Sequence, residues 1–247
     1  MALPSNSTTR FSDRSDAYAR HRPSYPDAAL DALFEGLKAS SLVVADVGAG
    51  TGISSRQLAQ LVRRVVAVEP NAVMRDRAEP ADNLEWRDGT AERTGLAEKS
   101  VDVAAAFQAF HWFDPELAFQ EFRRISRLRL GMVQYERDES DPFSAAYGEI
   151  VRRHATDDTE GLRARMLHTF ARMGGADTRR RDVPFGQTLD LEGVLGRVDS
   201  SSYLPKTGEL GEALRGEVRD LFATFQHGGI VTMAMTAHVL TLDLVER

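Results

Sequence analysis

Three glycines and two acids in the first third of the chain could together bind a nucleoside. Asp46 precedes Gly48, Gly50 and Gly52, which occupy every second position, and Glu69 follows 21 residues after Gly48. Glycine lets the backbone approach a ligand closely where a strand meets its helix. A carboxylate after the next strand can accept hydrogen bonds from both hydroxyls of a ribose. The spacing therefore predicts the cofactor-binding half of an open α/β sheet.

The position of the third glycine separates two cofactors. A dinucleotide site has the pattern Gly-x-Gly-x-x-Gly, in which the third glycine lets the helix pack closely on the strand. Here the third glycine, Gly52, comes one residue early, and the run from Asp46 to Gly52 resembles motif I of the class I S-adenosylmethionine (SAM) methyltransferases. SAM has no phosphate, so the turn of that family curls around the amino-acid end of the cofactor. A purely conformational glycine turn is the alternative interpretation.

Apolar runs and turn residues predict the strands and helices that would position this loop. Strands are expected at 42–47, 65–69, 84–87, 101–106, 131–135, 183–189 and 230–245. Helices are expected at 26–37, 53–63, from 70, and at 115–127, 191–198 and 208–225. Strands and helices alternate through the first 135 residues. Right-handed crossovers then predict a Rossmann-like, doubly wound α/β fold, with a seven-stranded sheet whose last strand is antiparallel.

Four segments carry further structural expectations. Apolar residues in the last strand change parity between Met235 and Leu240, which indicates a bulge or a break. The run from Ile125 to Gly131 is expected to be a turn before the fifth strand. Residues 141–175 are expected to form two helices without a sheet partner, which predicts a helical cap over the active site. Residues 1–37 would form an N-terminal lid segment and helix, all within one domain spanning 1–247.

Motifs outside the glycine loop are similar to those of the type 11 small-molecule methyltransferases. They resemble the subgroup that carries a His-Trp-Phe-Asp motif, to which trans-aconitate methyltransferase-like proteins belong. The matching segments are Tyr18-x-x-x-Arg22-Pro23-x-Tyr25-Pro26, Gly89-Thr90-Ala91-Glu92, Ser100-Val101-Asp102, Gln108-Ala109-Phe110-His111-Trp112-Phe113-Asp114 and Ser201-Ser202-Tyr203-Leu204-Pro205. The resemblance covers nearly the whole chain and implies SAM as cofactor and S-adenosylhomocysteine as product. This chain departs from the family at Thr90, where Asp is usual, and it lacks the usual Leu-x-Pro-Gly-Gly turn before the fifth strand.

The resemblance also implies roles in binding SAM. The glycine loop would wrap the methionine portion, Glu69 would hold the ribose and Met74 would pack on the adenine. Tyr18 and Arg22 would reach the methionine carboxylate as the N-terminal segment folds over the cofactor. The residues implied to bind SAM are Tyr18, Arg22, Asp46, Gly48, Ala49, Gly50, Gly52, Glu69, Pro70, Met74, Gly89, Thr90, Ala91, Glu92, Phe107, Gln108 and Ala109.

The methyl acceptor is expected beside the His-Trp-Phe-Asp motif. His111 could be a catalytic general base, because histidine titrates near neutrality, or it could belong to a packed turn that shapes the pocket. In-line displacement at an activated methyl carbon can also proceed by proximity and alignment alone. The residues expected to bind the acceptor are Tyr25, His111, Trp112 and Tyr203, with Phe113 and Tyr147 as further candidates for an aromatic wall.

Composition argues against several other functions. A net charge of −6 without a basic stripe argues against nucleic acid as a partner. The chain has no cysteine, so disulfides and thiolate chemistry are absent, and its six histidines show no metal-binding spacing. No apolar run is long enough for a membrane span or a signal peptide. These features predict a cytoplasmic enzyme. We also expect a monomer or homodimer that acts on a small molecule, and an anionic acceptor could be recognised by Arg22, Arg152 and Arg153.

Two alternatives stay open at this point. An NAD-dependent oxidoreductase would use the same sheet, but the early third glycine and the lack of a Tyr-x-x-x-Lys set argue against it. A SAM-binding protein that does not catalyse, acting as a sensor or subunit, is the second alternative.

Overall fold

The parallel strands of the sheet bring the predicted motifs to one edge. The computed structural model describes residues 21–244. The parallel strands are β1 (Val43–Val47), β2 (Arg64–Val68), β3 (Leu84–Arg87), β4 (Val101–Phe107) and β5 (Ser126–Arg137). The sheet order is β3-β2-β1-β4-β5-β7-β6. Because the chain turns back across the sheet between β3 and β4, the switch point lies at the carboxyl ends of β1 and β4, where such sheets bind ligands.

Two long antiparallel strands complete the sheet. β7 (Val231–Asp243) runs antiparallel to β5 and to β6 (Thr178–Leu189), which confirms the predicted seven-stranded sheet. The pairing of β6 with β7 runs from Thr178–Leu242 to Leu189–Val231 without a shift, so the predicted bulge or break is wrong. In β7 the odd-numbered apolar residues up to Val239 pack on one face of the sheet, whereas the even-numbered Leu240 and Leu242 pack on the opposite face. The apolar residues therefore change from odd to even positions without any bulge in the strand.

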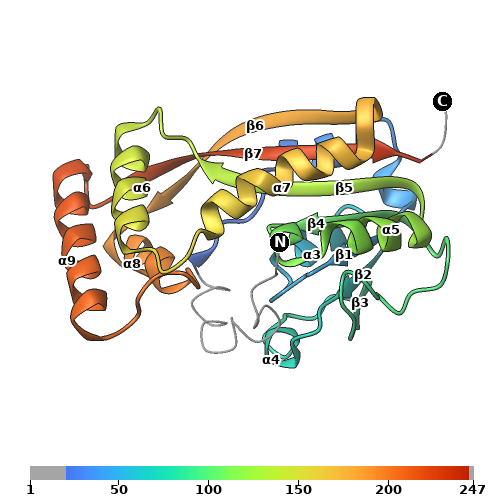
Figure 1. The fold of residues 1–247 in the computed structure, drawn as a ribbon, viewed down its shortest axis with the longest axis horizontal. Coiled ribbons are helices and arrows are strands. Elements are labelled where there is room, and N and C mark those ends of the chain that lie inside the picture. Colours follow the sequence, from blue (N-terminus) through green and yellow to red (C-terminus); the bar gives the residue numbers. More distant parts are fainter. Residues whose placement is uncertain (1–20, 245–247) are drawn as a thin grey trace.

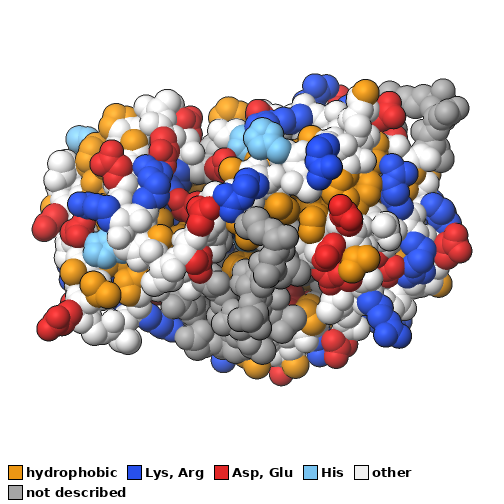
Figure 2. Space-filling view, in the orientation of Figure 1, with side chains coloured by type: hydrophobic (Ala, Val, Ile, Leu, Met, Phe, Trp, Pro, Cys, Tyr) orange, Lys and Arg blue, Asp and Glu red, His pale blue; other side chains and the backbone are white. Residues whose placement is uncertain are grey.

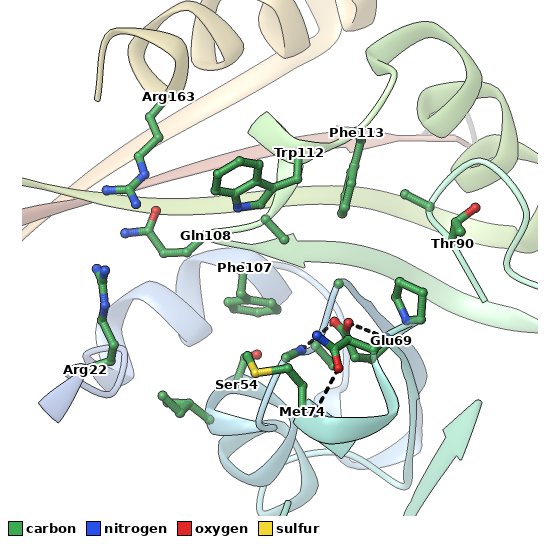
Figure 3. A pocket seen from close by; sticks show the side chains of 18 of the residues that line it. Arg22, Ser54, Glu69, Met74, Thr90, Phe107, Gln108, Trp112, Phe113 and Arg163 are labelled. Carbon is green, nitrogen blue, oxygen red and sulfur yellow. Dashed lines mark hydrogen bonds between the residues drawn. The ribbon is translucent and has the colours of Figure 1, made fainter. Parts of the chain in front are cut away.

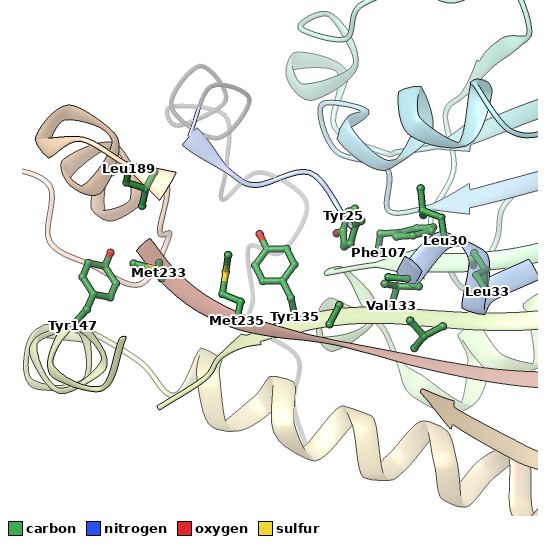
Figure 4. Packing of buried hydrophobic residues seen from close by; sticks show 14 of the residues in the cluster. Tyr25, Leu30, Leu33, Phe107, Val133, Tyr135, Tyr147, Leu189, Met233 and Met235 are labelled. Atoms are coloured by element: carbon green, nitrogen blue, oxygen red, sulfur yellow. The ribbon is translucent and has the colours of Figure 1, made fainter. Parts of the chain in front are cut away.

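Helices cover both faces of the sheet and form these two cores (Figure 1). α2 (Asp27–Phe34) and α3 (Ile53–Ala59) bury Leu30, Leu33 and Leu58 in the first core, part of which Figure 4 shows. α5 (Pro115–Ile125) and α7 (Thr159–Gly174) cover the opposite face. There the rings of Phe110 and Phe170 lie 5.4 Å apart, edge to face.

Three helices gather at one end of the sheet (Figure 1). α6 (Pro142–His154) packs on α9 (Gly208–Phe225) and β7, and α8 (Leu191–Asp199) packs on α9 and β6. The two helices expected over 141–175 are present as α6 and α7. The expectation that neither has a sheet partner is wrong, since α6 contacts β5 and β7 and α7 contacts β7 and α5. The buried side chains Leu167 and Phe170 give α7 an apolar stripe that the sheet covers.

The start of β5 also differs from the sequence-based expectation. β5 begins at Ser126, directly after α5, in place of the turn expected at 125–131. Arg129 in this strand is 1% exposed. Its Nε donates to Asp243 at 2.6 Å, and its Nη1 and Nη2 donate to the carbonyl oxygens of Leu33 and Glu35 at 2.7 and 2.9 Å. This bonding lets a guanidinium replace apolar packing where β5, β7 and α2 meet.

Short elements connect these parts, namely η1 (Ala39–Ser41), α4 (Ala72–Arg75), η2 (Phe110–Trp112) and η3 (Gly175–Asp177). Among residues 21–244, no helix is long and apolar enough to cross a membrane. The same residues contain no cluster of His, Asp or Glu able to hold a metal ion. Figure 2 shows acidic and basic side chains interspersed over the visible described surface.

Candidate active site

A cavity of about 280 Å³ opens at the carboxyl ends of β1, β2 and β4. Figure 3 shows Glu69 and Met74 on one side of it, Trp112 and Phe113 across from them, and Arg22 at its far end. The implied SAM-binding residues that line this cavity are Arg22, Gly48, Ala49, Gly50, Glu69, Pro70, Met74, Thr90, Ala91, Glu92, Phe107, Gln108 and Ala109. Two residues expected to bind the acceptor, Tyr25 and Trp112, line the same cavity.

The backbone of the glycine loop explains its composition. Gly48, Gly50 and Gly52 have φ angles of 75°, 59° and 79°, a region that costs other residues about 1–2 kcal/mol. Gly48 N donates to the Val68 carbonyl oxygen at 2.8 Å, which ties the loop to the end of β2. Gly52 does not line the cavity; it directly precedes α3, so it serves the turn into that helix.

Glu69 lies at the end of β2 with its carboxylate at the cavity wall. Its Oε2 accepts a hydrogen bond from Gly50 N at 2.9 Å, and its Oε1 accepts one from Asn71 N at 2.9 Å. Burial raises the pKa of this carboxyl, and the two backbone N–H groups oppose that shift. The side chain therefore joins the glycine loop to the turn after β2. Each carboxylate oxygen keeps a further lone pair for ligand hydroxyls.

Asp46 lies behind the glycine loop and does not line the cavity. The residue is 0% exposed, and its Oδ2 accepts hydrogen bonds from the hydroxyls of Ser54 and Ser55 at 2.7 and 2.6 Å. Burial raises the pKa of Asp46 to about 6, although both hydroxyls oppose the shift. Asp46 thus fixes the start of α3 relative to β1, and any effect on a ligand passes through the loop.

The turn at residues 90–92 forms the next part of the wall. Thr90 N and Arg93 N each donate to the other residue's carbonyl oxygen at 3.2 Å, which closes the turn. Glu92 Oε1 accepts a hydrogen bond from Asp114 N at 2.8 Å and so connects the turn to the start of α5. Gly89 lies outside the cavity lining; a Cβ there would be 2.7 Å from the Thr94 carbonyl oxygen. Its role is therefore close backbone packing.

The turn after β4 forms the floor of the cavity. Gln108 has a φ of 51°, unusual for a residue other than glycine. Its Nε2 donates to the Tyr135 carbonyl oxygen at 3.0 Å, and within residues 21–244 its buried Oε1 has no hydrogen-bond partner. Figure 3 shows Gln108 and Arg163 on the same side of the cavity. Gln108 itself lines the cavity, so a buried carbonyl oxygen without a partner lies close to the place where a ligand would bind.

His111 is buried away from the cavity surface. His111 is 1% exposed and lines neither this cavity nor the second cavity described below. Its ring centroid lies 4.6 Å from that of Trp112, and α7 packs against the short helix η2 that contains both residues. The geometry thus places Trp112 at the cavity wall and His111 behind it, as expected for a packed turn.

The remaining predicted residues lie elsewhere. Tyr18 is outside the described residues. Tyr203 lines a second cavity of about 330 Å³, which shares Arg22, Tyr135 and Arg163 with the first. The Tyr203 hydroxyl donates to Glu160 at 2.9 Å. Tyr203 therefore lies in the adjoining cavity and not in the cavity beside the glycine loop, and its role in binding the acceptor stays a prediction.

Several lining residues were not predicted from the sequence. They are Pro23, Ile53, Ser54, Asn71, Asp114, Tyr135 and Arg163. Most of these residues lie within or directly next to a predicted motif, so their position in the sequence alone could have predicted that they line the cavity. Tyr135 and Arg163 carried no such signal, because only the packing of β5 and α7 brings them to the cavity.

The lining residues fit SAM chemically. Glu69 could accept hydrogen bonds from ribose hydroxyls, and Arg22 at the far end could pair with a methionine carboxylate (Figure 3). Ile53, Met74 and Ala91 supply apolar walls of the kind that an adenine ring requires. Because Gly50 has no side chain, its backbone is open to the cavity that it lines.

Comparisons with known proteins point to the same chemistry. A family model described as "Methyltransferase domain" matches residues 45–128. An uncharacterized methyltransferase of Mycobacterium tuberculosis is 34% identical over 219 residues, covering 87% of this chain and 86% of that protein. An uncharacterized methyltransferase-like protein of Schizosaccharomyces pombe is 28% identical over 197 residues, covering 78% and 77%.

Solved structures share the fold. A type II methyltransferase candidate from Anaeromyxobacter dehalogenans has a TM-score of 0.68 at 22% identity, covering 92% of this chain and 99% of that one. A methyltransferase candidate from an antibiotic biosynthesis pathway of Anabaena variabilis has a TM-score of 0.60 at 25% identity, covering 85% and 94%. The family match, the identity to the mycobacterial relative and the SAM-like cavity agree. The chain belongs to the SAM-dependent methyltransferase family and is an enzyme whose cofactor is SAM.

Proposed function

We propose that the protein transfers a methyl group from SAM to an oxygen, nitrogen or sulfur atom of a small-molecule acceptor. The observation that carries this proposal is the cavity where the glycine loop, Glu69 and Trp112 meet, together with the second cavity that adjoins it. The adjoining cavity supplies space for an acceptor of modest size. Membership of the methyltransferase family argues against the NAD-dependent oxidoreductase considered above.

The residues of this chain would hold SAM from three sides. Glu69 would accept hydrogen bonds from the ribose hydroxyls, and the backbone of Gly48 to Gly50 would contact the methionine portion. Met74 and Ala91 would enclose the adenine, and Arg22 would pair with the carboxylate. When bound, SAM supplies a methyl carbon that is already activated by the sulfonium. The contribution left to the protein is orientation of the acceptor and exclusion of water.

We propose that His111 shapes the cavity and does not act as a base. Its burial behind Trp112 supports this role, because a general base must reach the proton that it removes. The helices over 141–175 and the segment before residue 37 would close over the acceptor. Membership of the trans-aconitate methyltransferase-like subgroup, a single domain, a cytoplasmic location and a monomeric or homodimeric state stay predictions from the sequence.

The first experiment measures S-adenosylhomocysteine affinity by calorimetry in the wild type and in Glu69→Ala. Loss of the charge-assisted bonds to the ribose should weaken binding by about 1.5–3 kcal/mol, roughly 10-fold to 150-fold. Glu98→Ala is the matched control, because Glu98 is an exposed acid that does not line the cavity. Equal affinities in all three proteins would remove Glu69 from the proposed site. Binding without turnover on a broad acceptor panel would favour the non-catalytic alternative.

The role of His111 is tested separately with His111→Gln, once an acceptor is known. A cavity-shaping role predicts that the rate changes alike at every pH, because no titrating group in the reaction has been removed. The measurement is the pH profile of turnover in wild type and variant. Loss of an ionisation near neutrality from the profile of the variant would restore His111 as a general base.

A further inference from the structure

The second cavity lies between the sheet and the helices at its end. Tyr135 and Arg137 of β5, Tyr147 of α6, Arg163 of α7 and Arg197 of α8 line it. Its volume is about 330 Å³. Arg22, Tyr135 and Arg163 also line the SAM cavity, so a molecule in the second cavity would lie directly beside the methyl donor. Figure 3 shows Arg163 and Arg22 reaching toward this shared boundary from opposite sides.

The acidic residues around this cavity already have basic partners. Glu160 pairs with Arg137 at 2.7 Å and also accepts the Tyr203 hydroxyl. Glu139 pairs with Arg152. Glu136 lies 3.8 Å from His238. The ion pairs and hydrogen bonds of these carboxylates are therefore made with groups other than Arg163 and Arg197, although the charge of Arg163 also helps to lower the pKa of Glu160.

Arg163 and Arg197 keep buried donors that the described residues do not satisfy. Neither guanidinium has a carboxylate within 4.0 Å among residues 21–244, and Arg163 Nε and Arg197 Nη1 have no hydrogen-bond partner there. Arg197 is 7% exposed. Each cation instead faces an aromatic ring, Arg163 over Tyr203 at 5.7 Å and Arg197 over Tyr135 at 5.9 Å. Arg197 is thus buried and Arg163 is partly buried, and neither has a directly paired carboxylate. Burying a guanidinium without a paired anion is costly, so this arrangement fits a site whose counterion arrives as a ligand.

The Tyr135 phenol also lies in a region of positive electrostatic potential. Burial alone would raise its pKa, but the guanidinium groups of Arg22 and Arg197 outweigh burial and lower the pKa of Tyr135 to about 8. A bound sulfonium would add a further positive charge at this boundary. Several cations held close together repel one another unless an anion lies among them.

We propose that the second cavity binds the methyl acceptor through a carboxylate or phosphate group held by Arg163 and Arg197. This inference rests on the proposed function, since it names the acceptor class of the same site. Arg22 is left for the methionine carboxylate of SAM. The two further arginines hold the acceptor, and planar guanidinium groups match the two oxygens of a carboxylate or phosphate. Tyr147 and Tyr203 supply aromatic walls for the rest of the molecule.

The test compares charged probes with neutral probes of the same shape. Benzoate and phenyl phosphate are the charged probes, and benzamide and phenol are their neutral counterparts. Binding of each is measured by calorimetry, with and without S-adenosylhomocysteine. The proteins are the wild type, Arg163→Gln, Arg197→Gln and Arg197→Lys. Arg219→Gln is the matched control, because it removes one positive charge from an exposed position on α9.

The proposal expects at least one charged probe to bind about tenfold more tightly than its neutral counterpart. Arg163→Gln and Arg197→Gln should each abolish that preference, Arg197→Lys should retain part of it, and Arg219→Gln should leave it unchanged. A stronger response to benzoate or to phenyl phosphate distinguishes a carboxylate from a phosphate ligand.

Equal binding of charged and neutral probes, no binding of either, or an undiminished preference in both Gln variants would overturn the proposal. Thermal unfolding of the same proteins, followed by circular dichroism, shows that each variant is folded. Failure of the wild type to bind S-adenosylhomocysteine would contradict the proposed function instead. The probe comparison without S-adenosylhomocysteine would still decide the acceptor class.

Discussion

Substituting Gly48 with alanine tests how tightly the glycine loop is built against the turn after β4. Two costs are expected. The φ of 75° is a left-handed conformation, which costs alanine about 1–2 kcal/mol. The new Cβ would also lie 2.7 Å from Ala109 Cβ and 2.8 Å from Phe113 Cζ. Ala109 Cβ is fixed to the backbone and the Phe113 ring packs against Phe110 and Phe122, so neither can move freely.

The matched control, Gly95→Ala, separates the two costs. Gly95 has a φ of 73°, but a Cβ there would meet nothing within 4 Å. Overpacking at Gly48 should cost about 1–3 kcal/mol beyond the conformational cost that both variants share. The unfolding entropy of a chain of 247 residues is about 0.5 kcal/mol per kelvin, so each kcal/mol lowers Tm by about 2 °C. Gly48→Ala should therefore melt about 2–6 °C below Gly95→Ala.

The assay is thermal unfolding followed by circular dichroism, with and without S-adenosylhomocysteine. Ala109 and Phe113 both line the cavity that is proposed to hold SAM, so Gly48→Ala should also show a smaller ligand-induced rise in Tm than Gly95→Ala. Equal melting temperatures for the two variants would refute the steric argument. A full ligand response in Gly48→Ala would show that the loop can relax without disturbing the cavity.

Three further predictions concern buried charges. Burial raises the Asp46 pKa from 3.8 to about 6, so the wild type should lose unfolding free energy relative to Asp46→Asn as pH rises from 4 to 6; parallel urea-unfolding profiles would contradict this. The Tyr135 pKa is lowered from 10.0 to about 8, because neighbouring guanidinium groups outweigh burial. The wild type should therefore gain stability relative to Tyr135→Phe as pH rises from 8 to 10, with tyrosinate absorbance near pH 8 that the variant lacks. Arg129→Met should destabilise by about 3 kcal/mol, a fall of about 6 °C in Tm, because it leaves buried oxygens without their donor. Arg127 lies in the same strand as Arg129 and forms an exposed ion pair with Asp102 of β4. Arg127→Met should therefore lower the unfolding free energy by at most about 1 kcal/mol.

Local patterns predicted the parts of this protein that depend on near neighbours in the chain. The glycine loop, Glu69 and the parallel strands were predictable because a strand, a tight turn and a helix are specified by consecutive residues. The helix at 208–225 was predicted with its observed bounds. Where packing overrides the local pattern, prediction was wrong. The continuous β7 was read as broken because its second half enters a different core, and β5 begins five residues before its predicted start at Gly131.

The candidate site likewise has a part that local sequence patterns predicted and a part that depends on packing between distant elements. The sequence by itself determined most of the cavity that is proposed to hold SAM, since its residues lie at strand ends whose order follows from alternating strands and helices. Only the tertiary structure decided that His111 is buried, that Asp46 lies behind the loop, and that Tyr135 borders both cavities. It alone brought Arg163 and Arg197 to one cavity from α7 and α8. Such contacts depend on how distant elements pack together, and no short-range pattern in the chain encodes that packing.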